Sequence, residues 1–208
     1  MSVKVKICGI TNLADAQTAI EAGADLLGFV FYEKSPRYVT VQAARDIVRQ
    51  LPPFVAKVGV FVNASDELIS QALGECSLNV LQFHGDEAPQ ECVKFSVMSI
   101  KAFHVRDEKS LNALPAYHTD AWLLDSHTSE RRGGTGATFN WDLAVEAQKF
   151  GRPIFLAGGL TAENVAEAVL RVRPFAVDVS SGVEESPGKK EHSKVRRFIN
   201  AAKTLKNG

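Results

Sequence analysis

The amino-acid sequence predicts a single-domain (β/α)8 barrel, also called a TIM barrel, that spans residues 1–208. Strand-like and helix-like segments alternate along the whole chain, and no Ser- or Gly-rich linker divides them. Glycine and polar residues also gather where the predicted strands end. Eight successive strand–helix units favour a closed parallel barrel covered by helices. A chain of 208 residues is near the lower size limit for this fold, so its loops must be short.

The eight predicted strands are short and rich in apolar residues. Residues 3–7 alternate apolar and polar side chains, which indicates a strand with two different faces. Several others are continuous apolar runs, which is typical of strands covered on both sides. The predicted strands are Val3–Ile7, Leu26–Phe31, Lys57–Phe61, Val80–Phe83, Met98–Phe103, Ala121–Asp125, Ile154–Ala157 and Phe175–Val179.

Helical spacing of apolar residues follows most of these strands. The stripes lie within residues 13–23, 41–51, 68–73, 143–147, 165–172 and 195–205. The predicted N-cap residues are Asn12, Thr40, Ser65 and Thr161. The fourth helix, at about residues 88–95, should be short, and the fifth, at about residues 108–114, should be short or absent.

An open, doubly wound sheet is the alternative fold. No GxGxxG motif follows the first strand, where a dinucleotide-binding sheet would carry one. A barrel instead places its chemistry at the carboxyl ends of the strands and in the loops that follow. The chain carries reactive and glycine residues at those positions, namely Cys8, Arg37, His84, Asp125, Gly158, Gly159, Ser180, Ser181 and Gly182.

Composition excludes several functional classes. Lys plus Arg and Asp plus Glu each number 24, so no overall charge favours nucleic acid or an anionic membrane. No apolar run approaches the ~20 residues of a spanning helix, and the beginning of the chain lacks a secretory signal. Cys8, Cys76 and Cys92 match neither a disulfide framework nor zinc-ligand spacing. We expect a soluble cytoplasmic protein with no metal, nucleic-acid or membrane partner.

Two glycine-bearing loops predict a phosphate site. They are "FLAGGLTAENV" at 155–165 and "VDVSSGVE" at 177–184, after the seventh and eighth strands. Glycines allow close approach of the backbone, and the amino end of a helix attracts anions. Barrels often bind phosphate at these two loops. Alternatively, Gly158-Gly159 only makes a tight turn. The phosphate should be held mainly by backbone N–H groups.

Four side chains at strand ends are further candidates. Cys8 could be a small core residue, but its place at the carboxyl end of a strand favours function. Asp125 ends the apolar strand "AWLLD", where a carboxylate needs a partner or a task. Arg37 could hold a carboxylate through two parallel hydrogen bonds, or be solvated. His84 could serve as a ligand or base, or be structural.

The segment "RRGGTGATF" at 131–139 follows the sixth strand. Its length in an otherwise compact chain favours a mobile functional loop over a plain turn. It lacks the GK[ST] ending of a nucleotide-binding P-loop, which excludes that function.

Seven motifs along the whole chain resemble the phosphoribosylanthranilate isomerase family. They are "KICGIT" at 6–11, "GFVFYEKSPRYV" at 28–39, "LQFHGDE" at 81–87, "LLDS" at 123–126, "GGTGATFNW" at 133–141, "LAGGLTAENV" at 156–165 and "DVSSGVEESPGKK" at 178–190. Ala137 and Asn140 depart from the family pattern, in which a longer polar residue and an aspartate are common. The departures affect the expected contacts of the 131–139 loop.

The resemblance implies an Amadori rearrangement in tryptophan biosynthesis. N-(5-phosphoribosyl)anthranilate would become 1-(2-carboxyphenylamino)-1-deoxyribulose 5-phosphate. Asp125 would be the general acid that opens the furanose, and Cys8 the base that takes the C2′ proton. Arg37 would bind the anthranilate carboxylate. From its place at the end of the fourth strand, we also expect His84 among the substrate-binding residues. No cofactor is implied, the partner is a small phosphoribosyl molecule, and the assembly is a monomer or a homodimer.

Residues 3–8 can be placed by the same fold. Val3, Val5 and Ile7 should face the helices, and Lys4, Lys6 and Cys8 the barrel interior. Asp178 on the adjacent eighth strand is a plausible partner for a buried Lys6. A nearby ammonium would favour the thiolate of Cys8, and some desolvation would keep Asp125 protonated.

Two other functions are alternatives. One is another phosphosugar barrel, such as an epimerase or a thiamine-phosphate-type synthase, although the pairing of Cys8 with Asp125 argues against it. The other is a non-catalytic sensor of a phosphorylated ligand. Turnover of freshly generated phosphoribosylanthranilate would separate these hypotheses.

Overall fold

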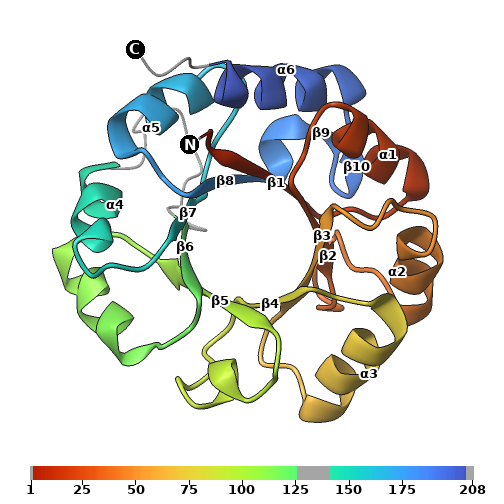
Figure 1. The fold of residues 1–208 in the computed structure, drawn as a ribbon, viewed down its shortest axis with the longest axis horizontal. Helices are drawn as coiled ribbons and strands as arrows, with labels where there is room; N and C mark the ends of the chain where they lie inside the picture. The colour runs from red at the N-terminus through yellow and green to blue at the C-terminus, as the bar shows by residue number, and fades with distance from the viewer. Residues whose placement is uncertain (1, 126–140, 205–208) are drawn as a thin grey trace.

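The protein is a closed barrel of eight parallel strands, seen end-on in Figure 1. The computed structural model describes residues 2–125 and 141–204. The strands are β1 (Lys4–Cys8), β2 (Leu26–Val30), β3 (Ala56–Phe61), β4 (Val80–Phe83), β5 (Met98–His104), β6 (Ala121–Asp125), β7 (Ile154–Leu156) and β8 (Ala176–Val179). Each strand pairs with the next along the chain, and β8 pairs with β1. The predicted barrel is confirmed, and the open sheet is excluded.

The described part of the chain forms six α-helices, and they surround the barrel (Figure 1). They are α1 (Leu13–Glu21), α2 (Val41–Val48), α3 (Asp66–Cys76), α4 (Trp141–Gln148), α5 (Val165–Val172) and α6 (His192–Lys203). Their apolar stripes pack against outward-facing strand residues such as Val5 and Ile7 in the main core. A second cluster, which includes Val58, Leu123 and Phe155, comes from residues of the opposite strand face and fills the barrel interior. None of the described helices is long and apolar enough to cross a membrane.

The predicted N-caps are confirmed at three of four positions. The side chains of Asn12, Thr40 and Ser65 each accept a hydrogen bond from a backbone N–H in the first turn of the following helix. The prediction for Thr161 is wrong, because α5 begins only after Asn164. Thr161 instead accepts from the N–H of Glu163 and closes the turn that leads into the helix.

The segments after β4 and β5 form 3-10 helices. The fourth predicted helix is reduced to η1 (Glu91–Val93), and η2 (Glu108–Ala116) replaces the fifth. Pro115 lies within η2 and has no N–H for an α-helical bond. The expectation of a short or absent fifth α-helix therefore holds, and the fourth shrinks further than expected.

A small hairpin after β8 was not predicted. The turn η3 (Ser181–Val183) leads into β9 (Glu184–Ser186), which pairs antiparallel with β10 (Lys189–Lys190). Gly188 has a φ of 83°, the left-handed conformation that suits glycine in the connecting turn. This hairpin brings Glu184 and Lys190 back to the barrel, and both are buried.

Candidate active site

A pocket of about 340 Å³ opens at the carboxyl ends of the strands. Its lining combines the ends of β1, β4 and β6 with the loops after β2, β7 and β8. The predicted site residues in its lining are Cys8, Arg37, His84, Asp125, Gly158, Gly159, Ser180, Ser181 and Gly182. The fold thus brings every predicted site residue to one pocket.

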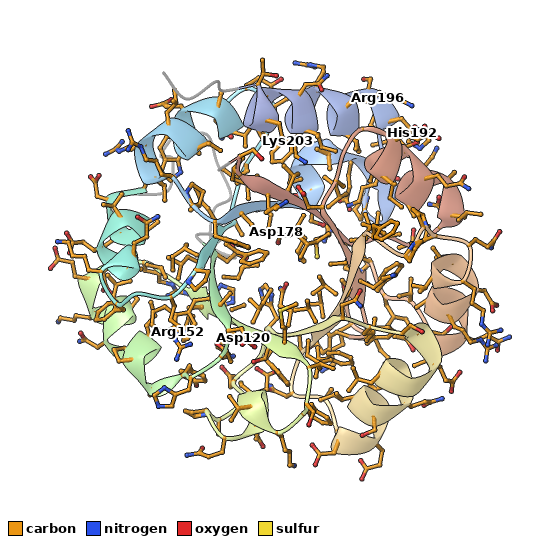
Figure 2. All side chains as sticks on the ribbon, viewed as in Figure 1. Asp120, Arg152, Asp178, His192, Arg196 and Lys203 are labelled. Carbon is orange, nitrogen blue, oxygen red and sulfur yellow. The ribbon has the colours of Figure 1, made fainter. Side chains whose placement is uncertain are left out.

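A buried ion pair lies inside the barrel, next to the pocket. Lys6 in β1 lies opposite Asp178 in β8, and its Nζ is 2.8 Å from Asp178 Oδ1. Figure 2 shows Asp178 on the inner side of the barrel. Burial alone would lower the pKa of Lys6, but Asp178 and Cys8 outweigh it and raise that pKa. The predicted pair is confirmed, and Lys6 is an ammonium.

Cys8 is buried beside this ammonium. Burial raises the pKa of its thiol, and the Lys6 charge opposes that rise only in part. Lys6 acts in the predicted direction, but the net shift favours the thiol. The predicted effect of the ammonium is therefore present, but the desolvation of the thiol is larger.

Gly28 is a supporting residue that sequence reasoning missed. A Cβ atom there would lie 2.8 Å from Cys8 Sγ and 3.2 Å from Lys6 Nζ. Only a residue without a side chain leaves room for both groups against β2. A glycine inside the apolar strand "LLGFV" was the available signal, since such a glycine often marks a close approach.

His84 lies between Gln82 and Asp125. Its Nε2 is 3.8 Å from Asp125 Oδ2, and its Nδ1 is 2.8 Å from the amide nitrogen of Gln82. With the Gln82 amide in this orientation its NH2 donates to Nδ1, which assigns the proton of a neutral His84 ring to Nε2, toward Asp125. Burial lowers the pKa of His84 more than Asp125 raises it, which favours that neutral ring. Gln82, a polar residue in the apolar strand "VLQF", was missed.

The two predicted anion loops touch one another. A Cβ at Gly182 would lie 2.0 Å from the carbonyl oxygen of Leu160, so only glycine allows this contact. Gly158 and Gly159 have φ angles of 87° and 66°. Ser180 Oγ is buried and has no hydrogen-bond partner among the described residues. The loops therefore present a glycine-rich surface and a hydroxyl to one end of the pocket.

Arg37 forms an ion pair with Glu184. Its Nε and Nη2 donate to the two carboxylate oxygens of Glu184, at 2.8 and 2.7 Å. Burial would raise the pKa of Glu184, but its hydrogen bonds with Arg37 and Lys190 outweigh that effect and lower it. Glu184 and Lys190 were not singled out from the sequence; they lie within "DVSSGVEESPGKK".

Part of the predicted site lies outside the described residues. This applies to the predicted 131–139 loop and to Ala137 and Asn140, the two departures from the family pattern. The expected role of that loop stays a prediction.

The Lys6→Met variant should lower the free energy of unfolding by about 3–5 kcal/mol, because it leaves the carboxylate of Asp178 buried without its partner. Lys4→Met is a matched control on the same strand. Lys4, expected inside the barrel, is in fact exposed and pairs with Asp25, so its loss should cost only about 0–1 kcal/mol. Urea unfolding measures both variants, and similar midpoints would contradict the prediction.

Comparison with known proteins agrees with this geometry. A relative from Pelobacter propionicus named N-(5'-phosphoribosyl)anthranilate isomerase is 53% identical over 205 residues, which cover 99% of this chain and 98% of the relative. The solved phosphoribosyl anthranilate isomerase from Thermotoga maritima has a TM-score of 0.92 and 48% identity, and the match covers 98% of this chain and 100% of that one. Another solved structure, of such an isomerase with reduced 1-(o-carboxyphenylamino)-1-deoxyribulose 5-phosphate, has a TM-score of 0.89 and 46% identity, with the same coverage.

A closed barrel with a polar pocket where its strands end defines a class of protein, the (β/α)8-barrel enzymes. A sequence model of the family described as N-(5'phosphoribosyl)anthranilate (PRA) isomerase matches residues 5–201. The chain belongs to the N-(5'-phosphoribosyl)anthranilate isomerase family.

Proposed function

We propose that this enzyme catalyses the Amadori rearrangement of N-(5'-phosphoribosyl)anthranilate to 1-(2-carboxyphenylamino)-1-deoxyribulose 5-phosphate in tryptophan biosynthesis. One observation carries the proposal: a single pocket collects a cysteine, an aspartate, an arginine and two glycine-bearing loops. The reaction needs groups of these kinds, and a solved relative is described in complex with the reduced form of this product.

The substrate has two anionic ends, and the pocket offers a place for each. The phosphate would lie between the Gly158-Gly159 loop and the Ser180–Gly182 loop, held mainly by backbone N–H groups. The first loop has the left-handed backbone that favours glycine, and the second starts the short turn η3. The carboxylate would bind at Arg37, which also lines the pocket.

Asp125 would act first, as the general acid. It donates a proton to the ring oxygen of the furanose while the C1′–O bond breaks, and the amine nitrogen supplies the electron pair that forms the iminium. The neutral His84 ring has its Nε2–H near Asp125 Oδ2, at 3.8 Å between heavy atoms.

Cys8 would act second, as the general base. It removes the C2′ proton, the electrons of that bond form the C1′–C2′ double bond, and the iminium nitrogen becomes neutral. The resulting enolamine then tautomerises to the ketone. The strands β7 and β8 separate Asp125 on β6 from Cys8 on β1, which leaves room for a ribose between the acid and the base. The iminium of the substrate is itself the electron acceptor, so this route uses no cofactor.

Turnover tests the proposal directly. Freshly generated N-(5'-phosphoribosyl)anthranilate is mixed with the enzyme, and formation of the ribulose phosphate product is followed over time. Catalytic conversion well above the uncatalysed rate supports the proposal. Stoichiometric binding without conversion would instead indicate a sensor, and neither binding nor conversion would contradict the substrate assignment.

The Arg37→Ala variant should raise KM for this substrate with kcat nearly unchanged. The carboxylate that Arg37 would hold is charged before and after the reaction, so its loss removes binding that is equal in the ground and transition states. Lys34→Ala, which removes an exposed charge from the same loop, is the control and should leave both constants unchanged. A large fall in kcat at constant KM would show that Arg37 takes part in the chemistry.

The assembly and the compartment remain predictions. The exposed apolar residues Phe54, Met98 and Phe175 precede or begin strands, and so lie at the barrel end opposite the pocket. A related Thermotoga maritima enzyme is described as dimeric, which favours the homodimer over the monomer. Sedimentation analysis of the purified chain decides between the two. Cytoplasmic location is the setting that the sequence analysis predicts.

A further inference from the structure

A chain of buried charges joins Arg37 to the backbone of Cys8. Glu184 accepts two hydrogen bonds from Arg37, and its Oε1 is also 2.9 Å from Lys190 Nζ. Lys190 Nζ in turn donates to the carbonyl oxygen of Cys8 at 2.6 Å and lies 3.4 Å from that of Ser180. The three ion-paired residues, which we name the Arg37 clamp, thus connect the loops after β1, β2 and β8.

The stem of Arg37 has a defined path toward Glu184. A Cβ atom at Gly9 would lie only 2.6 Å from Arg37 Cδ, so the stem rests directly on the backbone of Gly9. Gly9 also has a φ of 77°, which side-chain-bearing residues rarely adopt. The arginine is therefore guided at its stem by Gly9 and at its head by Glu184.

Glu184 is itself fixed from several sides. It lies opposite Lys190 in the β9–β10 hairpin, and its Oε1 also accepts from the N–H of Gly188 at 3.3 Å. The backbone N–H of Lys190 donates to Asp15, which anchors the hairpin to α1. Lys190 Nζ has three acceptors, which match the three N–H groups of an ammonium.

A guanidinium has five N–H donors, and the side-on pair with Glu184 uses Nε and one N–H of Nη2. Among the described residues the structure gives no hydrogen bond to Nη1. Its two N–H groups and the second one of Nη2 form the other edges of the fork, and an end-on carboxylate can bind there.

The charge of the clamp also fits a single carboxylate. The charges of Arg37 and Glu184 alone would cancel, and the carboxylate of a substrate would then meet an ion pair with no net charge. Burial lowers the pKa of Lys190 more than Glu184 raises it. When Lys190 is protonated, two positive groups and one negative group leave a net charge of one. A monoanionic carboxylate beside Arg37 restores neutrality in this half-buried place.

We propose that Glu184 is the positioning residue of substrate recognition: it sets the orientation of Arg37 so that the free edge of the guanidinium meets the aryl carboxylate. Lys190 completes the clamp by balancing the charge of Glu184 and tying the pair to Cys8. The inference rests on the proposed function and names the residues that determine its preference for a carboxylated amine.

The experiment measures dissociation constants by calorimetry with two probes. One is the reduced product, 1-(o-carboxyphenylamino)-1-deoxyribulose 5-phosphate in reduced form, and the other is the same compound without the carboxyl group. Glu184→Gln keeps the shape but turns an NH2 group toward Arg37 or Lys190. It should raise the dissociation constant of the carboxylated probe about tenfold, because a guanidinium held in the wrong orientation loses much of its contact with the carboxylate. The dissociation constant of the other probe should change by less than about twofold. Glu185→Gln, a neighbour whose exposed carboxylate pairs with Lys189, should change neither.

A double-variant cycle distinguishes positioning from general disturbance. If Glu184 acts through Arg37, then Glu184→Gln should cause no further loss for the carboxylated probe once Arg37→Ala is present. Equal weakening of both probes, or full additivity of the two substitutions, would overturn the proposal. Wild-type affinity for the carboxylated probe in Glu184→Gln would overturn it as well.

A folding failure can be separated from these results. If Glu184→Gln does not fold, the Glu184→Gln/Lys190→Met variant removes both charges, so the fully buried ammonium of Lys190 is not left without its partner and only the partly exposed Arg37 loses its carboxylate. The same selective loss is expected there, and equal loss for both probes again overturns the proposal. If the wild-type protein neither binds the carboxylated probe nor converts substrate, the proposed function itself has failed.

Discussion

Cys8→Ser should lower kcat by about 10²–10⁴-fold, the usual contribution of a general base. Serine is nearly isosteric with cysteine, so the fold should be retained. Its hydroxyl is a far weaker base than a thiolate near neutral pH, and the C2′ proton would stay in place. The measurement is kcat with freshly made substrate, together with circular dichroism to verify folding.

The control for this variant is Cys76→Ser. Cys76 is also buried, but it lies on α3 away from the pocket and its Sγ donates to the carbonyl oxygen of Val41, a bond that a hydroxyl can keep. Its kcat should match the wild type. The pH profile adds a second check: because burial raises the pKa of Cys8, kcat/KM should still rise with pH on the alkaline side of neutrality. A folded Cys8→Ser enzyme with more than about a tenth of wild-type kcat would rule out the base.

Asp125→Asn should lower kcat by a similar factor, about 10²–10⁴-fold, because an amide has no acidic proton for the ring oxygen. The substrate should still bind, since its phosphate and carboxylate would be held elsewhere in the pocket, as proposed above. The same kinetic assay measures kcat, and the dissociation constant of the reduced product measures binding.

Asp120, a carboxylate five positions earlier in the chain, supplies the matched control. It precedes β6 at the opposite end of the barrel, where its Oδ2 accepts from the N–H of Ser99. Asp120→Asn keeps an acceptor oxygen and should leave kcat close to the wild-type value. An Asp125→Asn enzyme that folds, binds the reduced product and turns over at a comparable rate would show that another group opens the ring.

Local pattern was sufficient for the barrel and for much of the pocket. The alternation in residues 3–8 correctly separated the outward Val5 and Ile7 from the inward Lys6 and Cys8. It was wrong for Lys4, which is exposed at the start of the strand. Strand ends are visible in a sequence, and a parallel barrel gathers all carboxyl ends at one rim. That rule alone was enough to bring Cys8 and Asp125 to a shared pocket.

The residues that support the pocket were harder to predict from the sequence. Gly28 and Gln82 left local signals, a glycine and a polar residue inside apolar strands, but nothing in the chain shows what they face. Thr161 looked like a helix cap, yet the helix begins later because a turn comes first. Such differences depend on a few backbone angles, which residue preferences determine only weakly.

The sequence by itself determined the fold class, the family and the residues at the rim, because periodicity and motif order are properties of the linear chain. Only the tertiary structure decided that Arg37 pairs with Glu184 and that Lys190 reaches the carbonyl oxygen of Cys8. These partners are 147 and 182 residues apart along the chain, and no local preference selects one buried partner among many. It also decided the direction of the Cys8 pKa shift, since desolvation depends on every group packed around the thiol and not on its neighbours in sequence.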